Sequence, residues 1–162
     1  MKQKNAKNKG FGLLEIAIGI SVISLSIFSL TAVSNLALKL TEESAKNTQA
    51  SFLLEEAVEA LKILRDSSWS ANIASLAPET VYYLSFANHN WQATSTNIYI
   101  DGIFERNFVF HDVNRDINDD IVSSGGLPDP DTKKLTVFVS WRSRNSTTTQ
   151  SVSAYITNLF NN

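Results

Sequence analysis

The sequence predicts an α+β fold, in which a long N-terminal helix packs on a C-terminal antiparallel β-sheet and its first half spans a membrane. Three observations support this prediction. Residues 16–38 form an uncharged and mostly apolar run, residues 51–69 continue with helical amphipathic spacing, and four later segments are rich in β-branched and aromatic residues. The 162-residue chain has room for one ordinary domain and an anchor.

The apolar run is long enough to cross a membrane. As a helix, residues 16–38 would extend roughly 35 Å at about 1.5 Å per residue, against a hydrocarbon core of about 30 Å. Its serines and Thr31 can return their hydroxyl hydrogen bonds to the helix backbone, so they need not prevent insertion. Glu15 stands at the edge of this run, and an ionisable group in such a place is a functional candidate.

The charges around the run predict an orientation. Four bases and no acid precede it: Lys2, Lys4, Lys7 and Lys9. The positive-inside rule therefore places the N-terminus in the cytoplasm and the rest of the chain outside, as a single-pass membrane protein. A secretory signal peptide has an apolar region of about 7 to 15 residues and a small-x-small cleavage site. This run is longer and has no persuasive site of that kind, so we favour an anchor.

Helical spacing continues beyond the run. The segment SFLLEEAVEALKILRDSSW (residues 51–69) has an apolar stripe, and its charged residues lie largely on other faces. The stripe consists of Leu54, Ala57, Val58, Leu61 and Leu64. No glycine or proline interrupts residues 20–77, so one helix is predicted from about residue 12 to about residue 66. The C-terminal half of the chain is expected to cover the stripe.

The C-terminal half reads as β-structure. Strands are predicted over residues 80–86, 97–113, 134–143 and 150–160. Asp101 and Gly102 predict either a hairpin turn or a bulge, and residues 144–149 predict a polar loop between the last two strands. The predicted organisation is thus a segment of residues 1–10, a transmembrane helix of residues 11–38, an outer amphipathic helix of residues 39–67 and a β-sheet domain of residues 80–162.

Composition argues against several classes of function. The chain has no cysteine, so disulfides, thiolate metal sites and cysteine nucleophiles are excluded. After residue 10, 16 acids face 10 bases, a formal charge of −6, which argues against nucleic-acid binding as the main activity. The sequence shows no nucleophile-elbow, phosphate-loop or zinc-protease motif, so no catalytic residues and no enzymatic activity are predicted.

One acidic segment resembles a calcium loop in composition. Oxygen-bearing side chains alternate along it, at Asp112, Asn114, Asp116, Asn118 and Asp120, and Ca²⁺ takes six to eight oxygen ligands. The EF-hand order fails, because Ile117 replaces the required glycine and Ser123 replaces the required glutamate. Asp and Asn are also ordinary turn formers, so a solvated turn is favoured over a calcium site, and no other cofactor is predicted.

The stretch KGFGLLE (residues 9–15) resembles the cleavage and methylation signature of type IV pilins and type II secretion pseudopilins. The resemblance implies a leader of residues 1–10, cleavage between Gly10 and Phe11 by a prepilin peptidase, and N-methylation of Phe11. It also implies that Glu15 pairs with the N-terminal amine of a neighbouring subunit. Gly12 departs from the threonine that the family usually has. Some similar pseudopilins have metal-binding loops, which favours calcium somewhat.

The resemblance leads to a functional expectation. The chain is expected to be a structural subunit of a type IV pilus or pseudopilus in the cytoplasmic (inner) membrane, or in a periplasmic or extracellular filament. Its expected partners are the peptidase, other pilin or pseudopilin subunits and the membrane. Ala32, where many major pilins have a proline, and the lack of cysteine favour a minor subunit. The alternative is a single-pass anchored binding domain that does not assemble, which would keep Met1 at its N-terminus.

Overall fold

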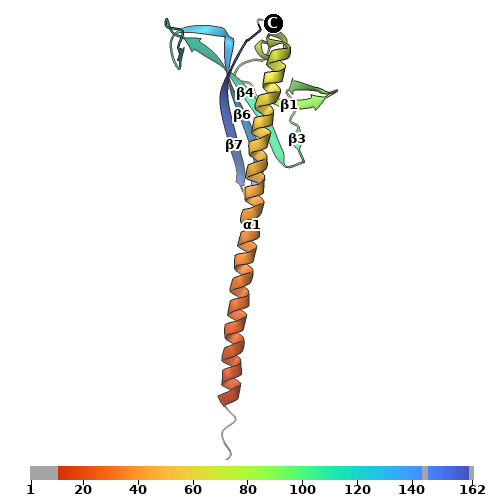
Figure 1. The fold of residues 1–162 in the computed structure, drawn as a ribbon, viewed down its shortest axis with the longest axis vertical. Helices are drawn as coiled ribbons and strands as arrows, with labels where there is room; N and C mark the ends of the chain where they lie inside the picture. The colour runs from red at the N-terminus through yellow and green to blue at the C-terminus, as the bar shows by residue number, and fades with distance from the viewer. Residues whose placement is uncertain (1–10, 144–145, 161–162) are drawn as a thin grey trace, which may run out of the picture. The chain divides into compact units, whose positions relative to one another are not determined.

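The computed structural model describes residues 11–143 and 146–160. It has one long helix, α1 (Phe11–Ser67), a short π-helix, η1 (Ser70–Ala74), and seven strands (Figure 1). The chain divides into two compact units, residues 1–45 and residues 46–162. In the second unit, the outer part of α1 packs on a C-terminal antiparallel sheet, so the predicted α+β class is confirmed.

Helix α1 runs for 57 residues without interruption and ends within a residue or so of the predicted position. Where the helix ends, polar side chains bond the carbonyl of Leu64, which also accepts from the Ser68 amide at 3.2 Å. Ser67 Oγ donates to it at 2.9 Å and Asn72 Nδ2 donates to it at 3.0 Å. The four last carbonyls of a helix have no partner within the helix, so these hydrogen bonds stabilise its end.

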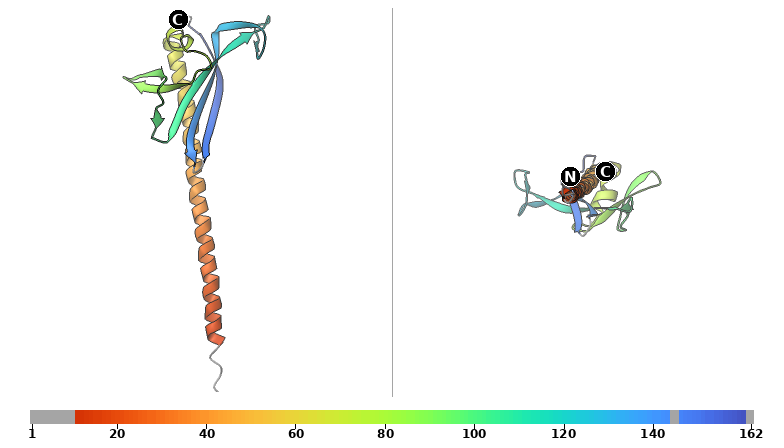
Figure 2. Two further views of the ribbon diagram at one scale, coloured as in Figure 1. Left: turned by 180° about the vertical axis from the view of Figure 1, so that it is seen from behind. Right: turned by 90° about the horizontal axis from the view of Figure 1, so that it is seen from below.

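The strands form one antiparallel sheet in the order β2-β1-β4-β6-β7, and β3 and β5 each pair with β4. The strands are β1 (Tyr82–Ala87), β2 (Asn90–Thr94), β3 (Tyr99–Ile100), β4 (Phe104–Arg115), β5 (Ile121–Val122), β6 (Leu127–Ser143) and β7 (Ser146–Thr157). The long strands β4, β6 and β7 are consecutive neighbours and make up the centre and one side of the sheet (Figure 2).

Two local features shape the sheet. Asp101 and Gly102 both have positive φ, 53° and 66°, and link β3 to β4 in a tight turn, so the hairpin alternative is the correct one. The β4–β6 register shifts between Asp112 and Val113, where Asp112 faces Lys133 but Val113 faces Asp129. Residues 130–132 of β6 are therefore extra in this pairing, and such an irregularity bends the strands locally.

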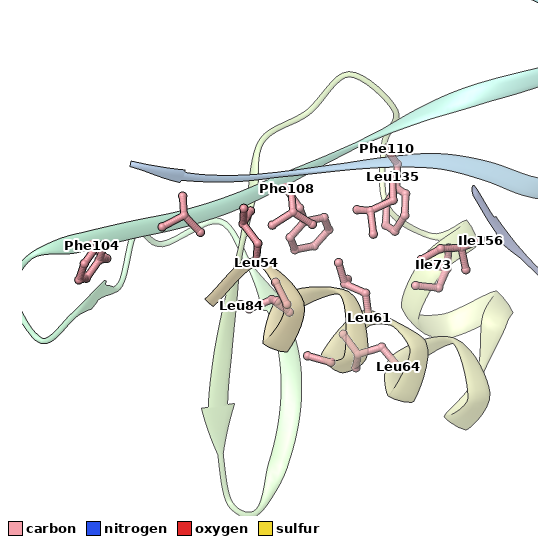
Figure 3. Close-up of a cluster of buried hydrophobic side chains, with 14 of the residues drawn as sticks. Leu54, Leu61, Leu64, Ile73, Leu84, Phe104, Phe108, Phe110, Leu135 and Ile156 are labelled. Carbon is pink, nitrogen blue, oxygen red and sulfur yellow. The ribbon is translucent and has the colours of Figure 1, made fainter. Parts of the chain in front are cut away.

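The core lies between the outer part of α1 and the sheet (Figure 3). Leu54, Ala57, Leu61 and Leu64 of the predicted stripe are buried, and Val58 is partly buried. Their partners on the sheet are Leu84, Phe104, Phe108, Phe110, Leu135, Val137, Val139, Trp141 and Ile156. Burying each large side chain contributes about 1.5 to 3 kcal/mol, so this contact holds the unit together. The expectation that the C-terminal half covers the stripe is confirmed.

Several strand boundaries differ from the sequence prediction. The polar loop predicted over residues 144–149 is wrong for residues 146–149, because its serine and threonines belong to β7 and pair with β6. Threonine is β-branched, so it favours an extended chain although it is polar. Strand β6 begins at Leu127 and includes Pro128 and Pro130, and strands β2 and β5 were not predicted.

Candidate functional site

The first part of α1 is apolar on all sides. Fifteen large apolar side chains between Leu13 and Leu40 are each 56–75% exposed within the described part of the chain. A helix with apolar residues all around its circumference is typical of a buried or membrane-spanning helix. The structure thus has, among its described residues, one helix that is long and apolar enough to span a membrane. This agrees with the predicted membrane-spanning segment.

Four hydroxyl groups in this segment are satisfied by the helix itself. Ser21, Ser26, Ser29 and Thr31 each donate to the carbonyl four residues earlier, at 2.8 to 2.9 Å. An unpaired hydroxyl in hydrocarbon costs several kcal/mol on water-to-alkane scales, so these hydrogen bonds remove an obstacle to insertion. The predicted return of these hydroxyls to the backbone is confirmed at the four positions.

Glu15 is the one charged side chain in the described residues before Lys39. Its side chain is exposed on α1, and its carboxylate makes no hydrogen bond or ion pair with any described residue. Phe11 is the first residue of α1, one turn before Glu15, while Gly10 lies outside the described residues.

The acidic segment is arranged around a protein cation, Arg115. Its Nε donates to Asp129 Oδ2 at 2.6 Å, one terminal nitrogen donates to the carbonyl of Asp119 at 2.7 Å, and the other donates to Thr132 Oγ1 at 3.3 Å. A guanidinium therefore lies among a carboxylate, a carbonyl and a hydroxyl, which are oxygen groups of the kind that calcium prefers.

The five predicted ligand residues do not converge in the described structure. Asp112 pairs with Lys133 across the β4–β6 ladder, and Asn114 is held in β4 opposite Val122 and Pro128. Asp116 uses Oδ1 to accept hydrogen bonds from the amides of two of the other candidates, Asn118 and Asp120, as a turn-forming aspartate does. Among the described residues, no three His, Cys, Asp or Glu side chains are grouped in a way that could hold a metal ion.

The carboxyl groups of this segment respond to their partners. The amides of Asp120 and Asn118 lower the pKa of Asp116 by donating hydrogen bonds to its charged form. Burial acts to raise the pKa of Asp129, but hydrogen bonds from Arg115, Thr132 and the Asp131 amide outweigh it, and the pKa is lowered. The folded structure therefore stabilises the ionised form of both carboxylates. In this form they accept the hydrogen bonds that hold the segment in place.

An ion pair with a buried arginine was not predicted from the sequence. Arg106 of β4 is only 5% exposed and pairs with Glu56 of α1 at 2.5 Å. Its guanidinium carbon also lies 5.3 Å from the ring centre of Trp91 in β2. The signal was present in the sequence, because Phe104 and Phe108 flank Arg106 at alternate positions and place it on the apolar face of the strand.

Comparisons with protein-family models, with curated proteins and with solved structures found no match for this chain. Any functional conclusion must therefore follow from its own residues.

Proposed function

We propose that this chain is a structural subunit of a type IV pilus or pseudopilus. In this proposal a prepilin peptidase cleaves it after Gly10, Phe11 becomes the methylated N-terminus, and the first part of α1 carries assembly. The supporting observation is Glu15, a carboxylate with no partner among the described residues, at the edge of an exposed apolar helix. The resemblance of residues 9–15 to the prepilin signature supplies the processing step.

The physical argument starts from the cost of an unpaired charge. A carboxylate at the edge of hydrocarbon needs an opposite charge, and ionisable groups in such segments are mostly functional. Cleavage after Gly10 creates an α-amine on Phe11, four residues or about 6 Å along the helix axis from Glu15. A neighbouring helix displaced by about one turn brings its amine level with this carboxylate. Packing subunits side by side then pairs two charges that are each costly alone.

The remaining features fit a minor, membrane-assembled subunit. Positive charges before residue 10 favour a cytoplasmic N-terminus, with the sheet outside the cytoplasmic membrane. Helix α1 continues through Ala32 without a break, which fits the lack of the proline found in many major pilins. The acidic balance beyond residue 10 supports a role other than nucleic-acid binding.

The test compares Glu15→Leu and Glu15→Gln with the parent chain in a host that has an active prepilin peptidase. Breaking a buried ion pair typically costs about 3 to 5 kcal/mol, so incorporation should fall by roughly a hundredfold or more in both variants. Intact mass reports loss of residues 1–10, and sheared filaments or crosslinks to neighbouring subunits report incorporation. Insertion and cleavage should continue, because neither step needs the pair.

The two variants separate the alternatives. Glu15→Gln keeps the size and polarity of the side chain but not its charge, so it isolates the ion pair from simple headgroup contact. A parent chain that keeps residues 1–10 would favour the anchored binding domain and contradict processing. Normal incorporation of Glu15→Leu would show that the carboxylate does not take part in assembly.

A further inference from the structure

Strand β7 is a long sheet edge without protection. It pairs with β6 through twelve consecutive residue pairs and with no other strand in the described part of the chain. Its residues, Ser146–Thr157, include no charged residue, no proline and no glycine, and its register shows no bulge. Natural sheets usually guard such an edge with a charge, a proline, a bulge or a short strand, since unpaired backbone groups there recruit another strand.

The other outer strands of this sheet are short, which limits their ability to pair with another chain. The opposite edge strand, β2, has five residues, and β3 and β5 have two residues each. Strand β7 has twelve residues and is regular throughout. An edge of this length presents several free N–H and C=O groups in one line, which is the template used in β-strand addition.

An apolar groove lies beside this edge, on the helix side of the sheet. It has a volume of about 340 Å³ and is lined by Leu54 and Val58 of α1 and Val152 of β7, with Ser51, Glu55 and Glu59 at its sides. Val152 shares the helix-facing side of β7 with Gln150, whose side chain bonds Asn47, and with buried Ile156. A strand added to β7 would direct alternate side chains over this groove.

The negative charge beside the groove favours a basic ligand. Glu55 is exposed and its carboxylate has no partner among the described residues, while Glu59 pairs with Lys62 at 2.6 Å. A side chain that enters beside Glu55 is therefore favoured if it is basic. A second copy of β7 is a poor occupant, because residues 146–157 offer no lysine or arginine to Glu55.

We propose that β7 and this groove bind an extended segment of a partner protein by β-strand addition. The segment pairs its backbone with β7, places a β-branched apolar side chain against Leu54, Val58 and Val152, and sets a lysine or arginine beside Glu55. This surface lies within residues 46–162 and is independent of Glu15, so it serves the chain whether or not it assembles.

The test uses the full chain in detergent micelles and a labelled peptide, Thr-Lys-Thr-Val-Thr-Val-Thr-Lys-Thr, as the probe. Fluorescence anisotropy should detect saturable binding, and amide hydrogen exchange should slow across residues 146–157. Val152→Glu replaces an apolar contact of the groove with a charge, where the valine of the peptide would pack, and should weaken binding by about tenfold or more. The control, Ser151→Glu, adds the same charge one residue away on the opposite face of β7 and should change binding by less than about twofold.

Two further measurements close the test. Glu55→Gln should weaken binding of the lysine peptide but not of the same peptide with its lysines replaced by glutamine, and thermal melts should show that each variant remains folded. Failure of the peptide to bind, equal effects of Val152→Glu and Ser151→Glu, or unchanged exchange in β7 would overturn the proposal. Self-association of the unliganded chain that Val152→Glu abolishes would also overturn it, in favour of a second copy.

Discussion

At the scale of single residues, the buried cation of Arg106 links three elements of the second unit. It lies on β4, pairs with Glu56 of α1 and faces the ring of Trp91 in β2. The pair is asymmetric, because the side chain of Glu56 is 49% exposed and that of Arg106 only 5%. Glu56 can remain in water without its partner, whereas Arg106 cannot. The buried Nε of Arg106 has no hydrogen-bond partner among the described residues, which adds to this dependence.

This asymmetry predicts unequal effects of removing the two partners. Glu56→Ala should destabilise the fold by about 1 to 3 kcal/mol, because it leaves Nη1 of the buried Arg106 guanidinium with only a long hydrogen bond, 3.5 Å, to the Leu53 carbonyl among the described residues. Arg106→Met removes the buried cation itself, and the double variant should return to within about 1 kcal/mol of the parent chain. Urea unfolding of the four chains measures this cycle. Additive losses in the double variant would contradict it.

At the scale of elements, the bent ends of β4 and β6 are fastened by ionised groups. Arg115 at the end of β4 holds Asp129 of β6, and Asp116 closes the turn that follows. The pKa values of both carboxyls are lowered in the folded chain. A lowered folded pKa means that the stabilisation is present above the unfolded value and is lost as the pH falls through that value towards the folded one.

The segment should therefore open in acid before the core does. Hydrogen exchange of residues 112–131, corrected for the intrinsic rate, should rise below about pH 4, near the unfolded pKa of aspartate. Asp129→Asn should raise exchange already at neutral pH and flatten its pH dependence. Asp120→Asn is the matched control, because that carboxylate makes no hydrogen bond in the described structure, whereas its backbone N–H and C=O both bond Asp116. Equal behaviour of the two variants would refute this explanation.

The sequence predicts those features that depend on residues close together in the chain. The apolar stripe ending at Leu64 and the turn at Asp101 follow from spacing and turn chemistry, and Glu15 stands out because its surroundings are uncharged. The contact of Arg115 with Asp129 depends on a register shift between the paired strands β4 and β6, which no local pattern reveals. Pro128 concealed the start of β6, because proline is expected only at edges or irregular positions of a sheet.

At the scale of the whole molecule, the chain combines two kinds of surface. The described residues up to Ala45 expose their large apolar side chains, whereas the part of the chain from Lys46 onward has a buried core between helix and sheet. The first unit is suited to lipid or to similar helices, and the second is suited to water. The division between them falls inside α1, so one continuous helix serves both environments.

This division predicts which truncations fold. A chain that begins at Lys46 should be soluble and unfold cooperatively, because it keeps the whole core. A chain that begins at Thr80 lacks α1 and should aggregate, because the apolar face around Phe108 and Leu135 would be uncovered. Size-exclusion chromatography with light scattering and urea unfolding compare the two. A soluble, cooperatively unfolding shorter chain would show that the helix is not needed to cover the sheet.

The core residues lie far apart in the sequence, so they are synthesised at different times. Leu61 is made early, but Ile156, at the far end of its core, follows roughly 95 residues later. At about 5 to 20 residues per second, synthesis leaves the stripe of α1 uncovered for about 5 to 20 s. During this interval the finished helix is an apolar surface without its sheet. A chaperone that holds this stripe until β7 emerges should raise the yield of folded chain, and the benefit should shrink when synthesis is faster.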